Sequence, residues 1–253
     1  MGFDFTNKSV IVTGASRGIG YAIAEAFCAA NANVTVIAET DAIIDASEKL
    51  SEAYGSVVTG IRCDIADVEQ VRRTIKQIDR IDILINNAGL ELITPIADVD
   101  EKVEADFRRI IDINVMGTFY VTRYSVPKMP VGGSILITCS IWSRTAVSEF
   151  SAYCTSKHAV LGFMRSMSQE LAPRGIRVNG VCPGWVKTEA SMRSLREIAE
   201  RSGQTEEDIL NEILGAQSLP GLMAPADIAD TYLYLSSKAA NNITGQAVNV
   251  DRG

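Results

Sequence analysis

Short apolar runs alternate with longer amphipathic stretches along almost the whole chain, and this alternation constrains the fold more than any other feature of the sequence. Chains with this pattern form a parallel sheet that is covered by helices on both faces. We therefore expect a single-domain, doubly wound α/β protein over residues 1–253. The runs that are rich in β-branched residues and bounded by Gly, Pro, Asn or Asp predict seven strands, at Ser9–Thr13, Asn33–Ala38, Val57–Arg62, Ile81–Asn86, Gly133–Cys139, Arg177–Cys182 and Gln246–Val250.

Two helical patterns are longer than the others, and one segment has no strand pattern at all. The long helices are expected at Asp100–Lys128 and Ser151–Ala172, the second with a serine cap and an end before Pro173-Arg174-Gly175. Residues 189–219 are charged and helix-prone and contain no strand pattern. Long insertions beyond the carboxyl end of a strand shape the ligand pocket in open α/β sheets. We therefore expect Glu189–Leu219 to be a helical substrate-binding lid, with a solvated surface excursion as the alternative.

The composition argues against several classes of protein. The 24 basic and 31 acidic residues give a net charge of −7, which disfavours a nucleic-acid-binding groove. No apolar run approaches the ~20 residues of a membrane helix, and the N-terminal residues contain no secretory signal. The five cysteines are widely spaced and His158 is the single histidine, so neither a disulfide framework nor a metal site is expected. We expect a soluble, cytoplasmic protein with no membrane or nucleic-acid partner.

A glycine-rich turn, TGASRGIG, follows the first predicted strand and leads into the amphipathic stretch Tyr21–Ala30. Glycines let the backbone approach a pyrophosphate closely, and the N-terminus of the following helix offers free N–H groups and a positive dipole end. No Lys-Ser or Lys-Thr pair follows, so the turn is not a Walker loop. It predicts a dinucleotide site, and a tight turn without a ligand is the alternative. The residues expected around the phosphates are Gly14, Ser16, Arg17, Gly18, Ile19 and Gly20.

The choice between NAD and NADP depends on the end of the second predicted strand. Glu39 lies there, where a carboxylate accepts hydrogen bonds from the adenosine ribose and repels a 2′-phosphate. NAD is therefore the expected cofactor. Arg17 in the glycine turn could instead reach a 2′-phosphate, so NADP stays as the alternative. Asp64, which closes the third strand beside Ile65, is placed to meet the adenine edge, and a helix N-cap is its other interpretation.

Four polar residues form a candidate catalytic group. Tyr153 and Lys157 lie four positions apart in a predicted helix, so their side chains share one face. An ammonium group beside a tyrosine favours the phenolate and lowers a pKa of about 10 towards the working range of a general base. Ser140 ends a predicted buried strand, so its hydroxyl opens onto the same edge of the sheet. Asn114 lies in an apolar part of a predicted helix, where its amide needs a partner.

These residues belong to six motifs in a fixed order: TGASRGIG at Thr13–Gly20, NNAG at Asn86–Gly89, Asn114, Ser140, YCTSK at Tyr153–Lys157 and PGWVKT at Pro183–Thr188. In these motifs the chain resembles the short-chain dehydrogenase/reductase family over nearly its whole length. The resemblance implies a Rossmann fold and an NAD(P)-dependent oxidoreductase. It also implies a homotetramer, although Arg252 stands where the family's C-terminal pattern usually has glycine.

The resemblance implies a role for each matching residue. Tyr153 would be the general acid/base, Ser140 would hydrogen-bond the substrate oxygen, and Lys157 would lower the tyrosine pKa and bind the nicotinamide ribose. Asn114 would hold a water that passes the proton to solvent. The remaining cofactor contacts would come from Asn86, Asn87, Ala88 and Gly89 on the adenosine side, from the bend Pro183-Gly184, and from Val186 and Thr188 at the carboxamide.

The residues around this group suggest the substrate. Trp142 and Trp185 would form an apolar wall, while Glu91 and Arg144 could bind hydroxyls or a carboxylate. Ile141 and Phe150 complete the expected substrate-facing set. The function expected is NAD-dependent oxidation of a sugar, a polyol or a small cyclic secondary alcohol to a ketone, or the reverse. The alternatives are a 3-hydroxy acid dehydrogenase, an NADPH-dependent ketone reductase and a non-catalytic dinucleotide sensor.

Overall fold

The structure, a computed structural model, describes residues 2–253. Within them, seven parallel strands form one sheet in the order β3-β2-β1-β4-β5-β6-β7. The order reverses between β1 and β4, and in sheets of this kind a crevice opens beyond the carboxyl ends of the strands at that point. The strands are β1 Ser9–Thr13, β2 Asn33–Ala38, β3 Val58–Arg62, β4 Ile83–Asn86, β5 Ser134–Thr138, β6 Arg177–Pro183 and β7 Ala247–Val250.

All seven predicted strands are confirmed, and β1 and β2 have the predicted bounds. The other five differ from the prediction by one or two residues at an end. The largest difference is at β4, which begins at Ile83 rather than at Ile81. The β-branched pattern therefore located every strand to within two residues at each end.

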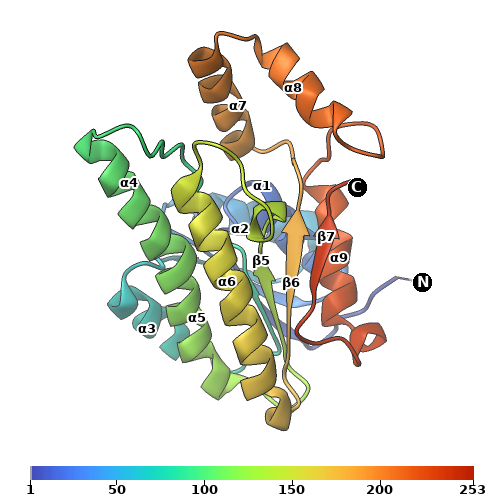
Figure 1. Cartoon of the computed structure of the whole chain (residues 1–253). Coiled ribbons are helices and arrows are strands. Elements are labelled where there is room, and N and C mark those ends of the chain that lie inside the picture. The colour runs from blue at the N-terminus through green and yellow to red at the C-terminus, as the bar shows by residue number, and fades with distance from the viewer. Residues whose placement is uncertain (1) are drawn as a thin grey trace.

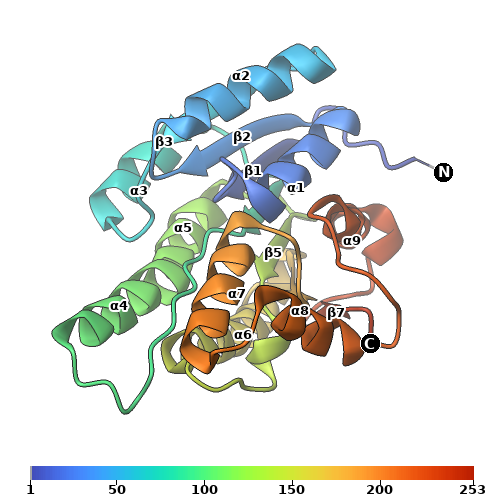
Figure 2. The same ribbon diagram turned by 90° about the horizontal axis from the view of Figure 1, so that it is seen from above.

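Helices cover both faces of this sheet, and no helix among residues 2–253 is long and apolar enough to cross a membrane. Figures 1 and 2 show one group, α1, α2 and α9, on one face and α3, α5 and α6 on the other, with α4 leading into α5. The first group comprises α1 Gly18–Ala29, α2 Ala42–Tyr54 and α9 Ala226–Ser236. The second comprises α3 Val68–Lys76, α4 Glu101–Ile111, α5 Thr118–Ser125 and α6 Ser151–Glu170.

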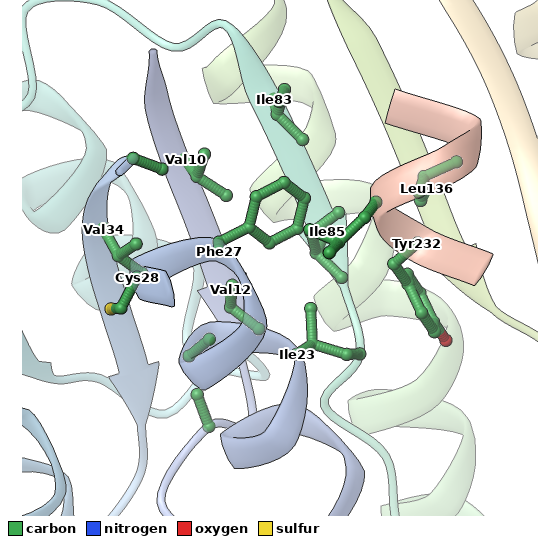
Figure 3. Close-up of a cluster of buried hydrophobic side chains, with 14 of the residues drawn as sticks. Val10, Val12, Ile23, Phe27, Cys28, Val34, Ile83, Ile85, Leu136 and Tyr232 are labelled. Carbon is green, nitrogen blue, oxygen red and sulfur yellow. The ribbon is translucent and has the colours of Figure 1, made fainter. Parts of the chain in front are cut away.

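The two faces of the sheet have separate hydrophobic cores, as the alternation of side chains along a strand requires. Val10 and Val12 of β1 pack in the core under α1, α2 and α9, whereas Ile11 packs in the core under α3, α5 and α6. Figure 3 shows Phe27 of α1 lying against β1 and β4, and Tyr232 of α9 beside the same cluster. Both aromatic side chains are fully buried. Each central strand thus contributes side chains to both cores, which hold a helical layer against each face of the sheet.

The segment predicted as one helix, Asp100–Lys128, is helical throughout but not uniform. Asp100 caps it by accepting from Lys102 N at 2.7 Å, and a 3₁₀ turn at Val126–Lys128 ends it. Between α4 and α5 the chain forms a π-helical turn over Asp112–Gly117. Such turns occur frequently at functional sites. This one contains Asn114, so the interruption lies at the candidate catalytic asparagine.

The prediction of a serine cap for α6 is wrong, because Ser151 is the first residue inside the helix. Its hydroxyl donates to Thr94 O at 2.7 Å. The Thr94 hydroxyl accepts from Ala152 N at 3.0 Å, which is the bond that a cap residue would supply. The cap therefore comes from a loop that is distant in sequence. The predicted end before Pro173 is confirmed by a 3₁₀ turn at Ala172–Arg174 and a left-handed Gly175.

The segment 189–219 contains two helices and no strand, as predicted: α7 Glu189–Ser202 and α8 Glu206–Gly215. Thr188 and Thr205 cap them by accepting from Ser191 N and Asp208 N. Figure 1 shows α7 and α8 standing beyond the carboxyl ends of β5 and β6. A small apolar cluster joins the two helices to each other, and its buried members are Leu195, Ala199 and Ile209. The hairpin is thus a separate packing unit above the sheet edge.

Candidate active site

A cavity of about 320 Å³ lies at the carboxyl ends of the strands, between the glycine turn and α7. Its walls come from most of the predicted motifs, which are far apart in sequence. Of the predicted cofactor residues it brings together Gly14, Ser16, Arg17, Gly18, Ile19, Gly20, Glu39, Asp64, Ile65, Asn87, Ala88, Gly89, Tyr153, Lys157, Pro183, Gly184, Val186 and Thr188. The sheet edge therefore assembles the dispersed motifs around one space.

The glycine turn packs tightly against the rest of the chain, because two of its glycines have no space for a side chain. Gly14 has a φ of +66°, and a Cβ on it would lie 2.6 Å from Ala88 Cα. A Cβ on Gly20 would lie 2.2 Å from Gly14 O. No side chain caps the N-terminus of α1, and no acidic residue lies in its first turn. The helix therefore presents its positive end and its free N–H groups to the cavity, a setting that suits a pyrophosphate.

Two carboxylates also line the cavity. Glu39 follows β2 and lines the cavity, and Asp64 follows β3 and does the same. Asp64 Oδ2 accepts from Arg109 of α4 at 2.8 Å, and its Oδ1 accepts from Ala66 N. Asp64 is not the cap of α3, since Asp67 caps that helix. Arg109 also lines the cavity; sequence reasoning missed it because it contacts Asp64 only through the packing of α4.

The NNAG motif separates into residues that line the cavity and one that does not. Asn87 Nδ2 donates to Thr13 O and Gly14 O, and its Oδ1 accepts from Thr138 Oγ1 at 3.1 Å. This side chain thereby ties the glycine turn to β5. Asn86 does not line the cavity, because its side chain points into the core and donates to Thr122 Oγ1.

The hydroxyl of Ser140 is oriented by its own backbone. Ser140 caps a 3₁₀ turn at Ile141–Ser143, where its Oγ accepts from Trp142 N at 3.1 Å and Ser143 Oγ accepts from Ser140 N. Because Oγ acts as an acceptor in that bond, its own hydrogen stays available for another oxygen. Ser140 lines the cavity together with Tyr153. It can therefore donate a hydrogen bond to an oxygen held there.

Tyr153 and Lys157 lie side by side on α6, with the Lys157 Nζ 5.4 Å from the centre of the tyrosine ring. Burial raises the pKa of Tyr153 well above its usual value, Glu91 raises it further, and the Ser140 hydroxyl opposes both. The expected lowering of the Tyr153 pKa by Lys157 is not seen in this structure. Burial also lowers the pKa of Lys157, whose Nζ donates to Thr138 O at 2.7 Å. Its position is thus fixed by β5.

Asn114 is buried behind these groups and does not line the cavity. Its Oδ1 accepts from Leu90 N at 2.7 Å, and its Nδ2 donates to Leu90 O and to Ser156 Oγ at 2.9 Å each. A Cβ on Gly89 would lie 3.4 Å from Asn114 Oδ1 and 3.6 Å from Lys157 Nζ, so both side chains reach the same backbone position. The partner that its amide needs is therefore the loop after β4 together with α6.

The predicted substrate residues separate into two groups. Glu91, Ile141, Trp142 and Trp185 line the cavity. Phe150 does not, since it is buried and packs against Trp142 with ring centres 5.2 Å apart. Arg144 does not either, because its guanidinium donates to Ala247 O of β7. Sequence reasoning missed the first residues of α7 that also form the wall, namely Glu189, Ala190 and Ser191.

Over almost its whole length the chain is similar to proteins that are named as reductases or dehydrogenases. A family model described as enoyl-(acyl carrier protein) reductase matches residues 14–253. A short-chain type dehydrogenase/reductase from Mycobacterium marinum is 32% identical, with a TM-score of 0.87 over 100% of this chain and 97% of that one. L-sorbose reductase from Gluconobacter frateurii, solved with NADPH and L-sorbose, is 26% identical, with a TM-score of 0.90 over 100% and 98%. A diacetyl reductase that forms (S)-acetoin, from Staphylococcus epidermidis, is 28% identical over 98% of each chain.

Proposed function

The chain belongs to the short-chain dehydrogenase/reductase family and is an NAD(P)-dependent oxidoreductase that acts on CH–OH groups, and from this premise we propose that it interconverts a secondary alcohol and its ketone with NAD. The observation that carries the proposal is the meeting of Ser140, Tyr153 and Lys157 in the cavity that the glycine turn also lines. Hydrogen-bond donor, acid/base and cation thus surround one space. The proposed substrates are sugars, polyols and small cyclic alcohols.

The residues that line the cavity suit the pyrophosphate, the adenosine and the nicotinamide of a dinucleotide. The open N-terminus of α1 and the close approach of Gly14 to Ala88 form a cradle for the pyrophosphate. Asp64 and Glu39 would hold the adenosine end, while Val186 and Thr188 would hold the carboxamide. The bound nicotinamide would accept or supply the hydride.

The proton chemistry belongs to the protein. In the oxidative direction Tyr153 Oη removes the proton from the substrate hydroxyl, and Ser140 Oγ donates a hydrogen bond to the same oxygen. Lys157 is held by Thr138 O so that its charge stays beside the phenol. The Asn114 side chain donates to Leu90 O and to Ser156 Oγ. These two hydrogen bonds join the loop after β4 to α6, the helix that carries Tyr153. In the reductive direction Tyr153 returns the proton.

NAD is favoured over NADP by two charged residues that line the cavity, Glu39 and Arg17. Glu39 would face the ribose hydroxyls and repel a 2′-phosphate. Arg17, the residue that would favour NADP, already forms an ion pair with Glu189 at 3.2 Å. The L-sorbose reductase similar to this chain was solved with NADPH, which keeps an NADPH-dependent ketone reductase as the second candidate.

A 3-hydroxy acid is disfavoured because two of the three cations in the cavity are paired with carboxylates and the third lies beside the Tyr153 ring. Among residues 2–253, the cationic side chains that line it are Arg17, Arg109 and Lys157. They are engaged with Glu189, Asp64 and Thr138 O respectively. Arg144, the residue expected to hold a carboxylate, points towards β7. L-sorbose and acetoin, which appear in the names of two similar proteins, are hydroxyketones and favour an uncharged substrate. The name of a third, a putative gluconate 5-dehydrogenase from Beutenbergia cavernae, contains a hydroxy acid.

The test is the rate of nicotinamide reduction with NAD and with NADP, against sugars, polyols, cyclic alcohols and 3-hydroxy acids. We expect turnover with NAD and a polyol or cyclic alcohol, and a relaxed preference for NAD in Glu39→Ala. Turnover with NADP alone would replace the proposal by the ketone reductase. A protein that binds NAD but turns over no alcohol or ketone would instead be a dinucleotide sensor.

We also propose that the protein is a cytoplasmic homotetramer, on the resemblance alone. Arg252, which replaces the usual glycine, has a φ of 65°, the left-handed conformation that favours glycine. It pairs with Asp227 at 3.7 Å and donates to Pro220 O. Light scattering should give four times the chain mass of 27.3 kDa, and a monomer would rule the tetramer out.

A further inference from the structure

Several buried polar atoms without a hydrogen-bond partner gather at one place, between the loop after β4 and the base of α7. Within residues 2–253 they are Glu91 Oε1, Trp185 Nε1, Arg193 Nε and Ser194 Oγ. A buried polar group without a partner costs about 1–3 kcal/mol, so such groups are rare unless a ligand completes them. Of the four residues, Glu91 and Trp185 also line the cavity that contains the candidate catalytic group. The two side chains therefore reach from the wall of the site into this buried cluster.

The Glu91 carboxyl lies near the reacting position. Burial raises the pKa of the Glu91 carboxyl itself, and the Ser194 hydroxyl and the Arg193 charge oppose this shift. When ionised, the carboxylate raises the pKa of Tyr153 and opposes the lowering of the Lys157 pKa by burial. Its backbone is held as well, since Arg193 of α7 donates to Glu91 O at 2.6 Å. The carboxyl thus projects from a loop that is anchored to the helix above it. A substrate group bound to Oε1 would lie close to the carbon that reacts.

The two unpaired atoms are complementary to a hydroxyl group. A carboxylate oxygen accepts hydrogen bonds, and the indole N–H only donates them. A hydroxyl does both, so it satisfies Glu91 Oε1 and Trp185 Nε1, whether by one group or by two neighbouring ones. A methyl or methylene at the same place would leave both atoms buried and unpaired.

We propose that Glu91, assisted by Trp185, determines substrate specificity by binding a second hydroxyl beside the reacting carbinol. The enzyme then prefers vicinal diols and their α-hydroxyketones over simple alcohols. This inference rests on the proposed alcohol dehydrogenase function, and it names the substrate class of that same site. The second hydroxyl of the substrate forms a hydrogen bond with the buried Glu91 carboxyl, and no covalent bond changes.

The experiment compares matched pairs of substrates: trans-1,2-cyclohexanediol with cyclohexanol, and 2,3-butanediol with 2-butanol. The quantity measured is the ratio of kcat/KM for diol to that for simple alcohol. The wild type should favour the diol by at least about tenfold, the value of one hydrogen bond to a charged group. Glu91→Ala and Trp185→Phe should bring the ratio towards one. Glu91→Gln, which keeps an acceptor, should restore much of it.

Glu48→Gln is the matched control, because Glu48 is exposed on α2 and does not line the cavity. It should leave the ratio unchanged, and circular dichroism of each variant checks that it folds. A wild-type ratio near one, or a ratio that Glu91→Ala leaves unchanged, overturns the inference while the proposed function stands. An absence of turnover with every alcohol and every ketone overturns both.

Discussion

At the scale of single residues, the state of the Tyr153 phenol decides how the site responds to pH. The sequence pattern predicts a tyrosine whose pKa is lowered by its lysine neighbour. In the structure burial raises that pKa, and the Glu91 carboxyl, which is not part of any Tyr–Lys motif, raises it further. Desolvation disfavours the charged phenolate more strongly than sequence spacing can reveal. The balance depends on side chains brought together by folding.

Glu91→Gln should therefore change the pH profile of alcohol oxidation. Oxidation needs the phenolate, so its rate rises with pH through the pKa of Tyr153. Removing the Glu91 charge removes one cause of the raised pKa, which moves the rising limb of kcat/KM to lower pH. Glu48→Gln, on the exposed face of α2, should leave the limb in place. A limb that moves to higher pH, or does not move, would contradict this assignment of the charge.

Ser140→Ala should separate catalysis from cofactor binding. The hydroxyl donates to the substrate oxygen and also caps the turn at Ile141–Ser143. We expect kcat to fall on the order of 10²-fold, as for other removed oxyanion donors. The dissociation constant for NADH, measured by fluorescence, should change little because the Ser140 hydroxyl makes no hydrogen bond to the glycine turn. An equal loss in NADH binding would assign the serine a structural role instead.

At the scale of elements, the strands were predictable and the helix starts were less so. Alternating β-branched runs located every strand because each central strand is buried on both faces. The start of α6 was predicted wrongly, since its cap comes from Thr94, which no local pattern connects to Ser151. The π-helical turn at Asn114 likewise cannot be predicted from apolar periodicity or from helix caps. Local patterns predict elements, and long-range hydrogen bonds set their ends.

Thr94→Ala should destabilise the fold through α6. It removes the acceptor of Ala152 N, and loss of a helix cap costs about 1 kcal/mol. The measurement is the free energy of unfolding in urea. Thr40→Ala is the control, because Thr40 is exposed and its side chain makes no hydrogen bond within residues 2–253. Equal stabilities for the two variants would show that Thr94 does not cap the helix.

The pair α7 and α8 should be less open to trypsin when cofactor and substrate are bound. Its contacts with the rest of the molecule include exposed ion pairs, Arg17–Glu189 and Arg201–Glu149, which stabilise weakly. Cleavage at Arg196, which is exposed on α7, should slow when NAD and a diol are added together. Rates of cleavage that are the same with and without the ligands would contradict a role for this segment as a lid.

At the scale of the whole molecule, one hydrogen-bond chain joins the core to the site. Tyr232 of α9 is fully buried, and its hydroxyl lies 2.6 Å from Thr138 Oγ1. The threonine donates to Asn87 Oδ1, so the tyrosine is the donor in its own bond. Lys157 bonds to the carbonyl of the same threonine. A core residue that sequence reasoning did not single out thus supports the cofactor cradle and the catalytic lysine.

Tyr232→Phe should lower the free energy of unfolding by about 1 kcal/mol, the net value of a typical buried hydrogen bond. Tyr234→Phe is its matched control on the same helix, because Tyr234 is 40% exposed. It should have no measurable effect. If both variants unfold at the same urea concentration as the wild type, the hydroxyl of Tyr232 does not contribute to stability.

The doubly wound fold and most of the cavity wall were predictable because the motifs follow individual strands, whose carboxyl ends meet at one edge. Asn86, Arg144 and Phe150 were expected at the cavity and point elsewhere, since a position in a motif does not fix the direction of a side chain. Arg109 and the first turn of α7 enter the wall through tertiary packing. Sequence order alone does not contain that information.

The most direct test of the central claim is the reduction of NAD by an alcohol substrate in the wild type and in Tyr153→Phe. The substitution keeps the ring and removes the hydroxyl that moves the proton. We predict a loss of kcat of about 10²-fold or more, with NADH binding retained. A Tyr153→Phe protein that oxidises the alcohol at the wild-type rate would contradict the account.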